Sequence, residues 1–154
     1  MRTTRKSDCR IALYPGSFNP FTKGHLSIAL RALRLFDRLV IGIGRNISKQ
    51  QTDQSDSRLE EIRRCFRDDK RVEVLFYEGL TVDFARHIGA CAMIRGVRGT
   101  ADFESERTLA DINRDLAPEI ETVILTALPE LGHISSSAVR ELAAHGHDPS
   151  IYLP

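Results

Sequence analysis

The sequence has few cysteines, and their positions argue against two kinds of site. Cys9, Cys65 and Cys91 are odd in number and scattered through 154 residues. There is no C-x-x-C pair and no cysteine–histidine spacing typical of zinc, so the sequence indicates neither a disulfide framework nor a metal centre. This cysteine usage is typical of a reduced, intracellular protein, and we expect a cytoplasmic one.

A charge excess and a long apolar run are also missing. Lys+Arg is 22 and Asp+Glu is 21, which gives a net charge of +1 and predicts no basic nucleic-acid surface. No apolar run approaches the roughly 20 residues of a membrane span. The polar, basic segment 1–9 lacks the apolar core of a secretory signal. We expect a single domain over 1–154 in which 1–9 is a flexible tail.

Apolar runs and helical periodicities alternate along the rest of the chain. Strands are expected at 10–14, 38–43, 72–77, 92–94 and 122–125, and helices at 24–36, 57–67, 81–88, 102–116 and 137–144. Thr81 is expected to cap its helix, and Gly89 to end it. The alternation predicts an α/β fold: a Rossmann-like, doubly wound, five-stranded, mostly parallel sheet with helices on both faces.

The first strand–helix junction concentrates residues suited to a ligand. It reads YPGSFNPFTKGH from Tyr14 to His25. Ligands of doubly wound sheets bind beyond the carboxyl ends of the strands, and a helix start offers N–H groups to phosphate. A rigid loop with a capping histidine is the alternative interpretation, but the combination of residues favours a phosphate site that His25 shares.

Two common phosphate motifs are absent. Lys23 precedes its glycine, so there is no G-x-x-x-x-G-K-[ST] loop. Ile47 occupies the third glycine position of a G-x-G-x-x-G that would start at Gly42, so a dinucleotide fingerprint fits poorly.

Four segments taken together resemble a known family. Thr22-Lys23-Gly24-His25 is similar to the T/HxGH signature of the nucleotidyltransferases. Segments 94–98 (IRGVR), 101–106 (ADFESE) and 134–137 (ISSS) follow in order, and the set resembles the bacterial phosphopantetheine adenylyltransferases over about 10–154. The resemblance implies adenylyl transfer from ATP to 4′-phosphopantetheine with Mg²⁺. The products are dephospho-coenzyme A and pyrophosphate, in the penultimate step of coenzyme A biosynthesis.

The resemblance also implies a role for individual residues. Contacts with ATP are implied for Ser17, Phe18, His25, Gly96, Val97, Arg98, Glu106, Leu131, Gly132, His133, Ile134, Ser135, Ser136 and Ser137. Contacts with phosphopantetheine are implied for Ser17, Lys49, Thr81 and Arg95. His25 is the expected catalytic residue, which stabilises the transition state of a direct in-line transfer. Mg²⁺ is expected to bind through substrate phosphates, with no ligand from a protein side chain.

The residues alone leave alternatives open. Lys49 and Arg98 are also compatible with solvated surface positions, and Ser135 to Ser137 with a cluster that only caps a helix. Two other functions remain: a nucleotidyltransferase for another phosphate acceptor, such as nicotinate mononucleotide, and a nucleotide-binding sensor without catalysis. The resemblance further implies a homo-oligomer, in this family a hexamer, and coenzyme A as a candidate inhibitor. Neither nucleic acid nor a membrane is an expected partner.

Overall fold

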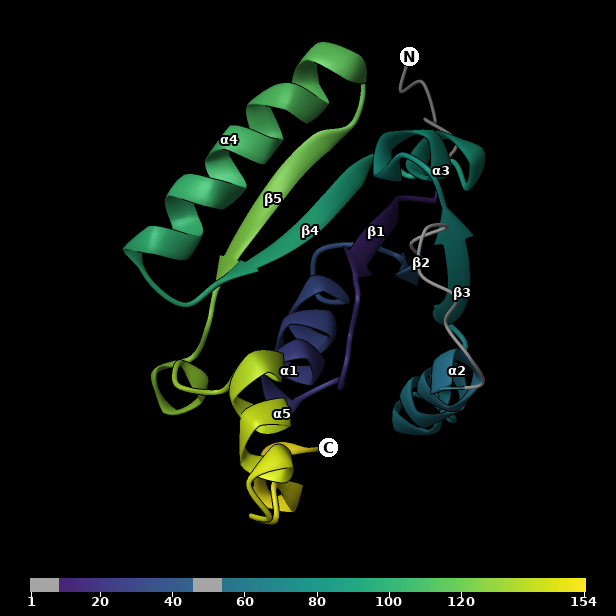
Figure 1. The fold of residues 1–154 in the computed structure, drawn as a ribbon. Helices are drawn as coiled ribbons and strands as arrows, with labels where there is room; N and C mark the ends of the chain where they lie inside the picture. Colours follow the sequence, from purple (N-terminus) through teal and green to yellow (C-terminus); the bar gives the residue numbers. More distant parts are fainter. Residues whose placement is uncertain (1–8, 46–53) are drawn as a thin grey trace, which may run out of the picture.

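The computed structural model describes residues 9–45 and 54–154 (Figure 1). The predicted tail, apart from Cys9, and the predicted ligand Lys49 lie outside the described residues. The strands are β1 (Ile11–Gly16), β2 (Arg38–Arg45), β3 (Val72–Glu78), β4 (Ala92–Val97) and β5 (Glu121–Thr126). The α-helices are α1 (Lys23–Ala32), α2 (Gln54–Cys65), α3 (Thr81–His87), α4 (Thr100–Leu116) and α5 (Ser136–Ala144). Two short 3-10 helices are η1 (Pro129–Leu131) and η2 (Ser150–Tyr152).

The five strands form one parallel sheet in the order β3-β2-β1-β4-β5. The predicted fold class is therefore confirmed. The strand order reverses between β1 and β4, because the chain first builds outward through β2 and β3 and then returns to the other side of β1. A ligand crevice is expected at this switch point, beyond the carboxyl ends of β1 and β4.

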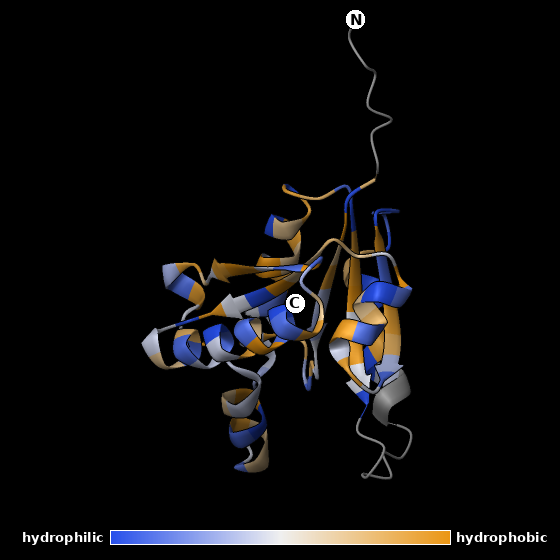
Figure 2. Ribbon diagram, turned by 90° about the horizontal axis from the view of Figure 1, so that it is seen from above, coloured by the Kyte–Doolittle hydropathy of each residue, from blue (hydrophilic) through white to orange (hydrophobic). Residues whose placement is uncertain are grey.

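Helices cover both faces of the sheet, and each face has its own apolar cluster. Ala12 and Tyr14 of β1 belong to the cluster under α1 and α2, whereas Leu13 belongs to the cluster under α3. Side chains alternate between faces along a strand, so a strand covered on both faces is apolar at successive positions. Figure 2 shows the same pattern as hydrophobic colour along the central strands.

Helix α4 differs from the other α-helices because none of its residues is buried. It lies along β4 and β5 at one edge of the molecule (Figure 1). Phe103, Leu109, Ile112 and Leu116 are 44%, 40%, 50% and 47% exposed. The helix therefore presents large apolar side chains to the outside.

Some local predictions differ from the structure. The prediction that Thr81 caps α3 is wrong: Leu80 is the N-cap, and the Thr81 hydroxyl lies 2.9 Å from the hydroxyl of Tyr77. Gly89 does follow the end of α3, with φ +71, as glycine permits. The first helix ends at Ala32 rather than near Phe36. Within 9–45 and 54–154, no helix combines the length and apolar character needed to cross a membrane.

Candidate active site

A cleft of about 510 Å³ lies at the predicted switch point. It is bounded by the loop after β1, the start of α1, the end of β4 with the first turns of α4, and the start of α5. The predicted site residues that line it are Ser17, Phe18, His25, Arg95, Gly96, Val97, Arg98, Glu106, Leu131, Ile134, Ser135, Ser136 and Ser137. The fold thus brings together four motifs that are far apart in the sequence.

Three other predicted residues do not line this cleft. Gly132 and His133 lie beside it in the segment before α5, and the His133 ring packs edge-on against Tyr152 at 5.8 Å. Thr81 lies at the start of α3, where its hydroxyl contacts Tyr77. Position 81 is therefore separate from the nucleotide motifs.

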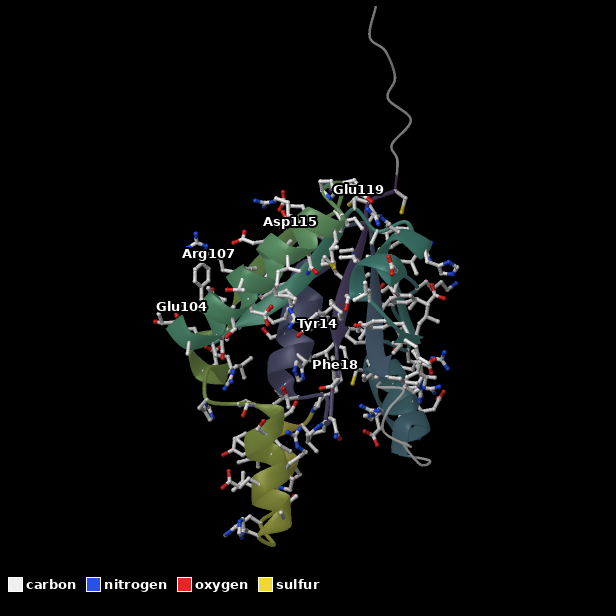
Figure 3. All side chains as sticks on the ribbon, turned by 45° about the horizontal axis from the view of Figure 1, so that its top comes forward. Tyr14, Phe18, Glu104, Arg107, Asp115 and Glu119 are labelled. Carbon is white, nitrogen blue, oxygen red and sulfur yellow. The ribbon has the colours of Figure 1, made fainter. Side chains whose placement is uncertain are left out.

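The loop after β1 has an unusual backbone around Phe18. Phe18 has a φ of 47, in the left-handed region, and its side chain is only 2% exposed. Its ring lies against Gly16, where an added Cβ would come within 2.9 Å of the ring. Figure 3 labels Phe18 and Tyr14 near the centre of the molecule, and their ring centroids are 5.1 Å apart. Gly16 thus permits the loop to fold back over a buried aromatic ring.

Side chains from other elements hold the carbonyl groups of this loop and of Pro15 at the end of β1. The bonds run from Arg95 Nη1 to Pro15 (3.1 Å), from Arg58 Nη1 to Ser17 (2.6 Å), from Arg140 Nη1 to Asn19 (2.5 Å) and from Ser136 Oγ to Pro20 (2.8 Å). Sequence reasoning missed Arg58 and Arg140, because an arginine on a helix usually faces solvent. The end of β1 is therefore fixed by β4, and the loop that follows it is fixed by α2 and α5.

His25 is oriented by a reciprocal cap at the start of α1. The backbone N–H of Thr22 donates to His25 Nδ1 at 3.0 Å, and the Thr22 hydroxyl accepts from the backbone N–H of His25 at 3.4 Å. Because Nδ1 accepts from an N–H group, it carries no proton, and we infer that the neutral ring has its proton on Nε2. The lowered pKa of His25 agrees with this state: burial, and then the nearby charge of Arg98, bring it to about 4. At neutral pH the ring is an uncharged hydrogen-bond donor.

Arg95 and Glu106 form a two-bond ion pair inside the cleft. Arg95 Nε lies 2.6 Å from Glu106 Oε2, and Nη2 lies 2.7 Å from Oε1. The two side chains are 26% and 16% exposed. Burial disfavours the charged guanidinium, but the hydrogen bonds and charge of Glu106 outweigh it, so the pKa of Arg95 lies above its ordinary value. Arg95 is therefore a fixed cation at the end of β4.

Arg98 and Asp102 pair at the more exposed mouth of the cleft. Asp102 Oδ2 accepts from the backbone N–H of Arg98 at 3.1 Å and lies 3.3 Å from Arg98 Nε. The side chains are 42% and 36% exposed. Asp102 was not predicted as a site residue, although its i+4 spacing from Arg98 is the signal that indicates such a pair.

The three serines of the I-S-S-S segment all make contacts within the protein. Ser135 Oγ accepts from the Ala138 N–H at 3.1 Å, so the predicted helix cap is confirmed. Ser136 donates to Pro20, and Ser137 Oγ accepts from Arg140 at 3.2 Å. The first N–H groups of α5 nevertheless lack helical partners, and they lie at the cleft. A helix start of this kind suits an anionic group such as phosphate.

Comparison with known proteins shows which sequences resemble this one. The sequence model of the cytidylyltransferase-like family matches residues 13–142. A phosphopantetheine adenylyltransferase of Phocaeicola vulgatus is 50% identical over 145 residues, which cover 94% of this chain and 95% of the relative. The Porphyromonas gingivalis enzyme of the same name is 48% identical over 144 residues, covering 94% of each chain. The Chloroflexus aggregans enzyme of that name is 46% identical over 145 residues, covering 94% of this chain and 90% of the relative.

A solved structure has the same fold with a more distant sequence. It is a bifunctional NMN adenylyltransferase/ADP ribose pyrophosphatase from Francisella tularensis, with a TM-score of 0.69 and 17% identity. The match covers 94% of this chain but 45% of that one, so the chain spans less than half of its solved neighbour. At this identity the comparison supports the fold alone.

Proposed function

The chain belongs to the phosphopantetheine adenylyltransferases of the cytidylyltransferase-like family, and we propose that its cleft transfers the adenylyl group of ATP to 4′-phosphopantetheine. The products are dephospho-coenzyme A and pyrophosphate, in the penultimate step of coenzyme A biosynthesis. One observation carries the assignment to this cleft: His25, Arg95 and the start of α5 line the same volume of about 510 Å³. A neutral donor, a half-buried cation and a helix N-terminus are suited to two phosphate substrates.

We place ATP along the starts of α1 and α5. The N–H groups of α5 face the triphosphate, and Gly96 to Arg98, Ser17, Leu131 and Ile134 to Ser137 complete the nucleotide side, with Gly132 and His133 beside it. The acceptor phosphate lies near Arg95 and Ser17, and Lys49 is its further ligand. Thr81 contacts the pantetheine arm, which extends away from the transferred group.

The transfer depends on positioning the two substrates more than on activating the attacking phosphate. The acceptor phosphate is already an anion at neutral pH, so one of its oxygens attacks the α-phosphorus of ATP without a general base. The protein must hold two polyanions in line and stabilise the charge that develops at the α-phosphate. The Nε2–H of His25 supplies that stabilisation as a neutral donor, and Arg98 bonds the triphosphate.

Mg²⁺ is the metal that we propose for this reaction. Among the described residues lining the cleft, the two carboxylates are Asp102 and Glu106, and both bond arginines. A metal that keeps several waters and binds mainly substrate phosphates fits such a cleft. When bound, it neutralises part of the triphosphate charge.

We propose that the protein assembles as a homo-oligomer, with the hexamer as the state that its family resemblance implies. The exposed apolar residues of α4 support a second copy packing on this helix, because large apolar surfaces are rarely left in water. Analytical ultracentrifugation gives the oligomeric state, and a purely monomeric protein at micromolar concentration would contradict the assembly.

We also propose a cytoplasmic enzyme, since ATP is its co-substrate and its three cysteines are free. Coenzyme A contains the phosphopantetheine group, so it is the candidate inhibitor. Inhibition that is relieved by excess phosphopantetheine would support competition at the acceptor site.

Pyrophosphate release tests the function directly. The protein, ATP and Mg²⁺ are incubated with 4′-phosphopantetheine or with nicotinate mononucleotide. We expect pyrophosphate release only with phosphopantetheine. Equal release rates with the two acceptors would favour a nucleotidyltransferase of broader acceptor specificity. ATP binding without pyrophosphate release would favour a nucleotide-binding sensor. His25→Ala should still bind ATP but turn over about 10²–10³ times more slowly, the usual effect of removing one transition-state donor.

A further inference from the structure

We propose that Glu106 is a positioning residue for the acceptor phosphate: it fixes the orientation of Arg95. This inference rests on the proposed function, because it takes Arg95 as a ligand of the phosphopantetheine phosphate. This role is separate from the ATP contact that the family resemblance implies for Glu106.

The geometry commits both oxygens of Glu106 to one partner. Oε1 and Oε2 accept from Nη2 and Nε of Arg95 at 2.7 Å and 2.6 Å. A third bond, from Nη1 to the Pro15 carbonyl at 3.1 Å, fixes the opposite side of the guanidinium. Two bonds from α4 and one from the end of β1 thus define the plane of the group.

The remaining donors of Arg95 match a phosphate. A guanidinium has five N–H groups, and three of them are used by Glu106 and Pro15. The two left are on Nη1 and Nη2, one on each nitrogen. Two such donors can bond two oxygens of one phosphate, provided that the group does not rotate.

The charge of Glu106 argues in the same direction. An ionised carboxylate only accepts hydrogen bonds and repels phosphate oxygens, so Glu106 cannot itself bind the acceptor phosphate. Paired with Arg95 it compensates a cation whose side chain is only 26% exposed. Glu106 therefore acts on substrate through Arg95.

Three variants separate positioning from ATP binding. Glu106→Gln removes the charge but keeps the shape, Glu106→Asp keeps the charge on a shorter chain, and Glu104→Gln is the matched control. Glu104 is exposed on the same helix, and Figure 3 shows it at the outer end of α4, far from Tyr14. We expect Glu106→Gln to raise the KM for phosphopantetheine by roughly tenfold or more, and by clearly more than it raises the KM for ATP. Glu106→Asp should fall between Glu106→Gln and wild type, and Glu104→Gln should match wild type.

A double-variant comparison then tests whether Glu106 acts through Arg95. In an Arg95→Ala background nothing is left to orient, so adding Glu106→Gln should change kcat/KM for phosphopantetheine by less than about twofold. The ratio is read from the linear region at low substrate, and circular dichroism confirms that each variant is folded.

The outcomes distinguish this inference from the function on which it rests. Wild-type protein that releases no pyrophosphate would overturn both. An active wild type whose Glu106→Gln variant has a raised KM for ATP instead would overturn only the positioning role. The positioning role would also be overturned if Glu106→Gln keeps its full effect in the Arg95→Ala background, or if Glu106→Gln changes neither KM.

Discussion

The neutral state of His25 predicts how stability changes with pH. Burial and the charge of Arg98 lower the pKa of His25 to about 4. In the unfolded chain His25 takes up a proton near its ordinary pKa of about 6.5, whereas the folded protein takes it up only near pH 4. As the pH falls through this window, the unfolded state gains protons first and the folded state loses stability. The loss is about 3 kcal/mol in full and about 2 kcal/mol by pH 5.

His25→Gln isolates this effect. Glutamine is an ordinary residue at the third helical position of a capping box, so its carbonyl can still accept from the Thr22 N–H, but it does not titrate. Urea denaturation of both proteins at pH 8 and pH 5, at one protein concentration, gives the free energies of unfolding. We expect wild type to lose about 2 kcal/mol more than the variant between these pH values. Equal losses would refute the argument, as would an ¹⁵N NMR spectrum in which the His25 proton is on Nδ1 at pH 7.

Three further predictions concern the loop, the acceptor site and the chemical path. Gly16→Ala should lower the free energy of unfolding by about 1–3 kcal/mol in a thermal unfolding measurement, because the added Cβ would lie 2.9 Å from the buried Phe18 ring. An unchanged free energy of unfolding would mean that the loop relaxes around the added methyl group. Arg95→Lys keeps the charge but loses the two-bond grip, so the KM for phosphopantetheine should rise much more than the KM for ATP. Equal changes in the two KM values would instead assign Arg95 to the binding of ATP. Incubation with α-labelled ATP and Mg²⁺ but no acceptor should leave no label on the denatured protein, because the acceptor phosphate is itself the nucleophile, His25 acts as a donor and none of the three cysteines lines the cleft. Retained label would replace direct transfer by a covalent route.

The order of elements was predictable because its signals are local, whereas several boundaries were not. The strand predicted over 92–94 continues to Val97 in the structure. Arg95 and Gly96 interrupt the apolar run and look like loop residues, yet they pair with Ile124 and Leu125 of β5. Strand pairing overrides the local signal there. A polar residue inside a strand that ends at a cleft is thus informative, because its side chain faces the site.

The motifs predicted which residues line the cleft, but they did not predict which partner each side chain bonds. The sequence indicates a charged residue at 106 on one side of its helix, yet the bond to Arg95 depends on how α4 lies against β4. The contact of Arg140 with Asn19 joins residues 121 positions apart, and that of Ser136 with Pro20 joins residues 116 apart. No local pattern encodes such distances.

The loop after β1 gives a physical reason for these distant contacts. Its backbone leaves the sheet at Gly16, so its carbonyl groups lose their ladder partners and need other donors. Donors from α5 meet that need at Asn19 and Pro20, and the same helix starts at the cleft. The I-S-S-S segment is therefore suited to two tasks at once: the Ser136 side chain holds α5 against the loop, and the first N–H groups of α5 are the ones that we propose for phosphate. A substitution of Ser136 should consequently affect the loop and the nucleotide together, which a residue that only touched ATP would not do.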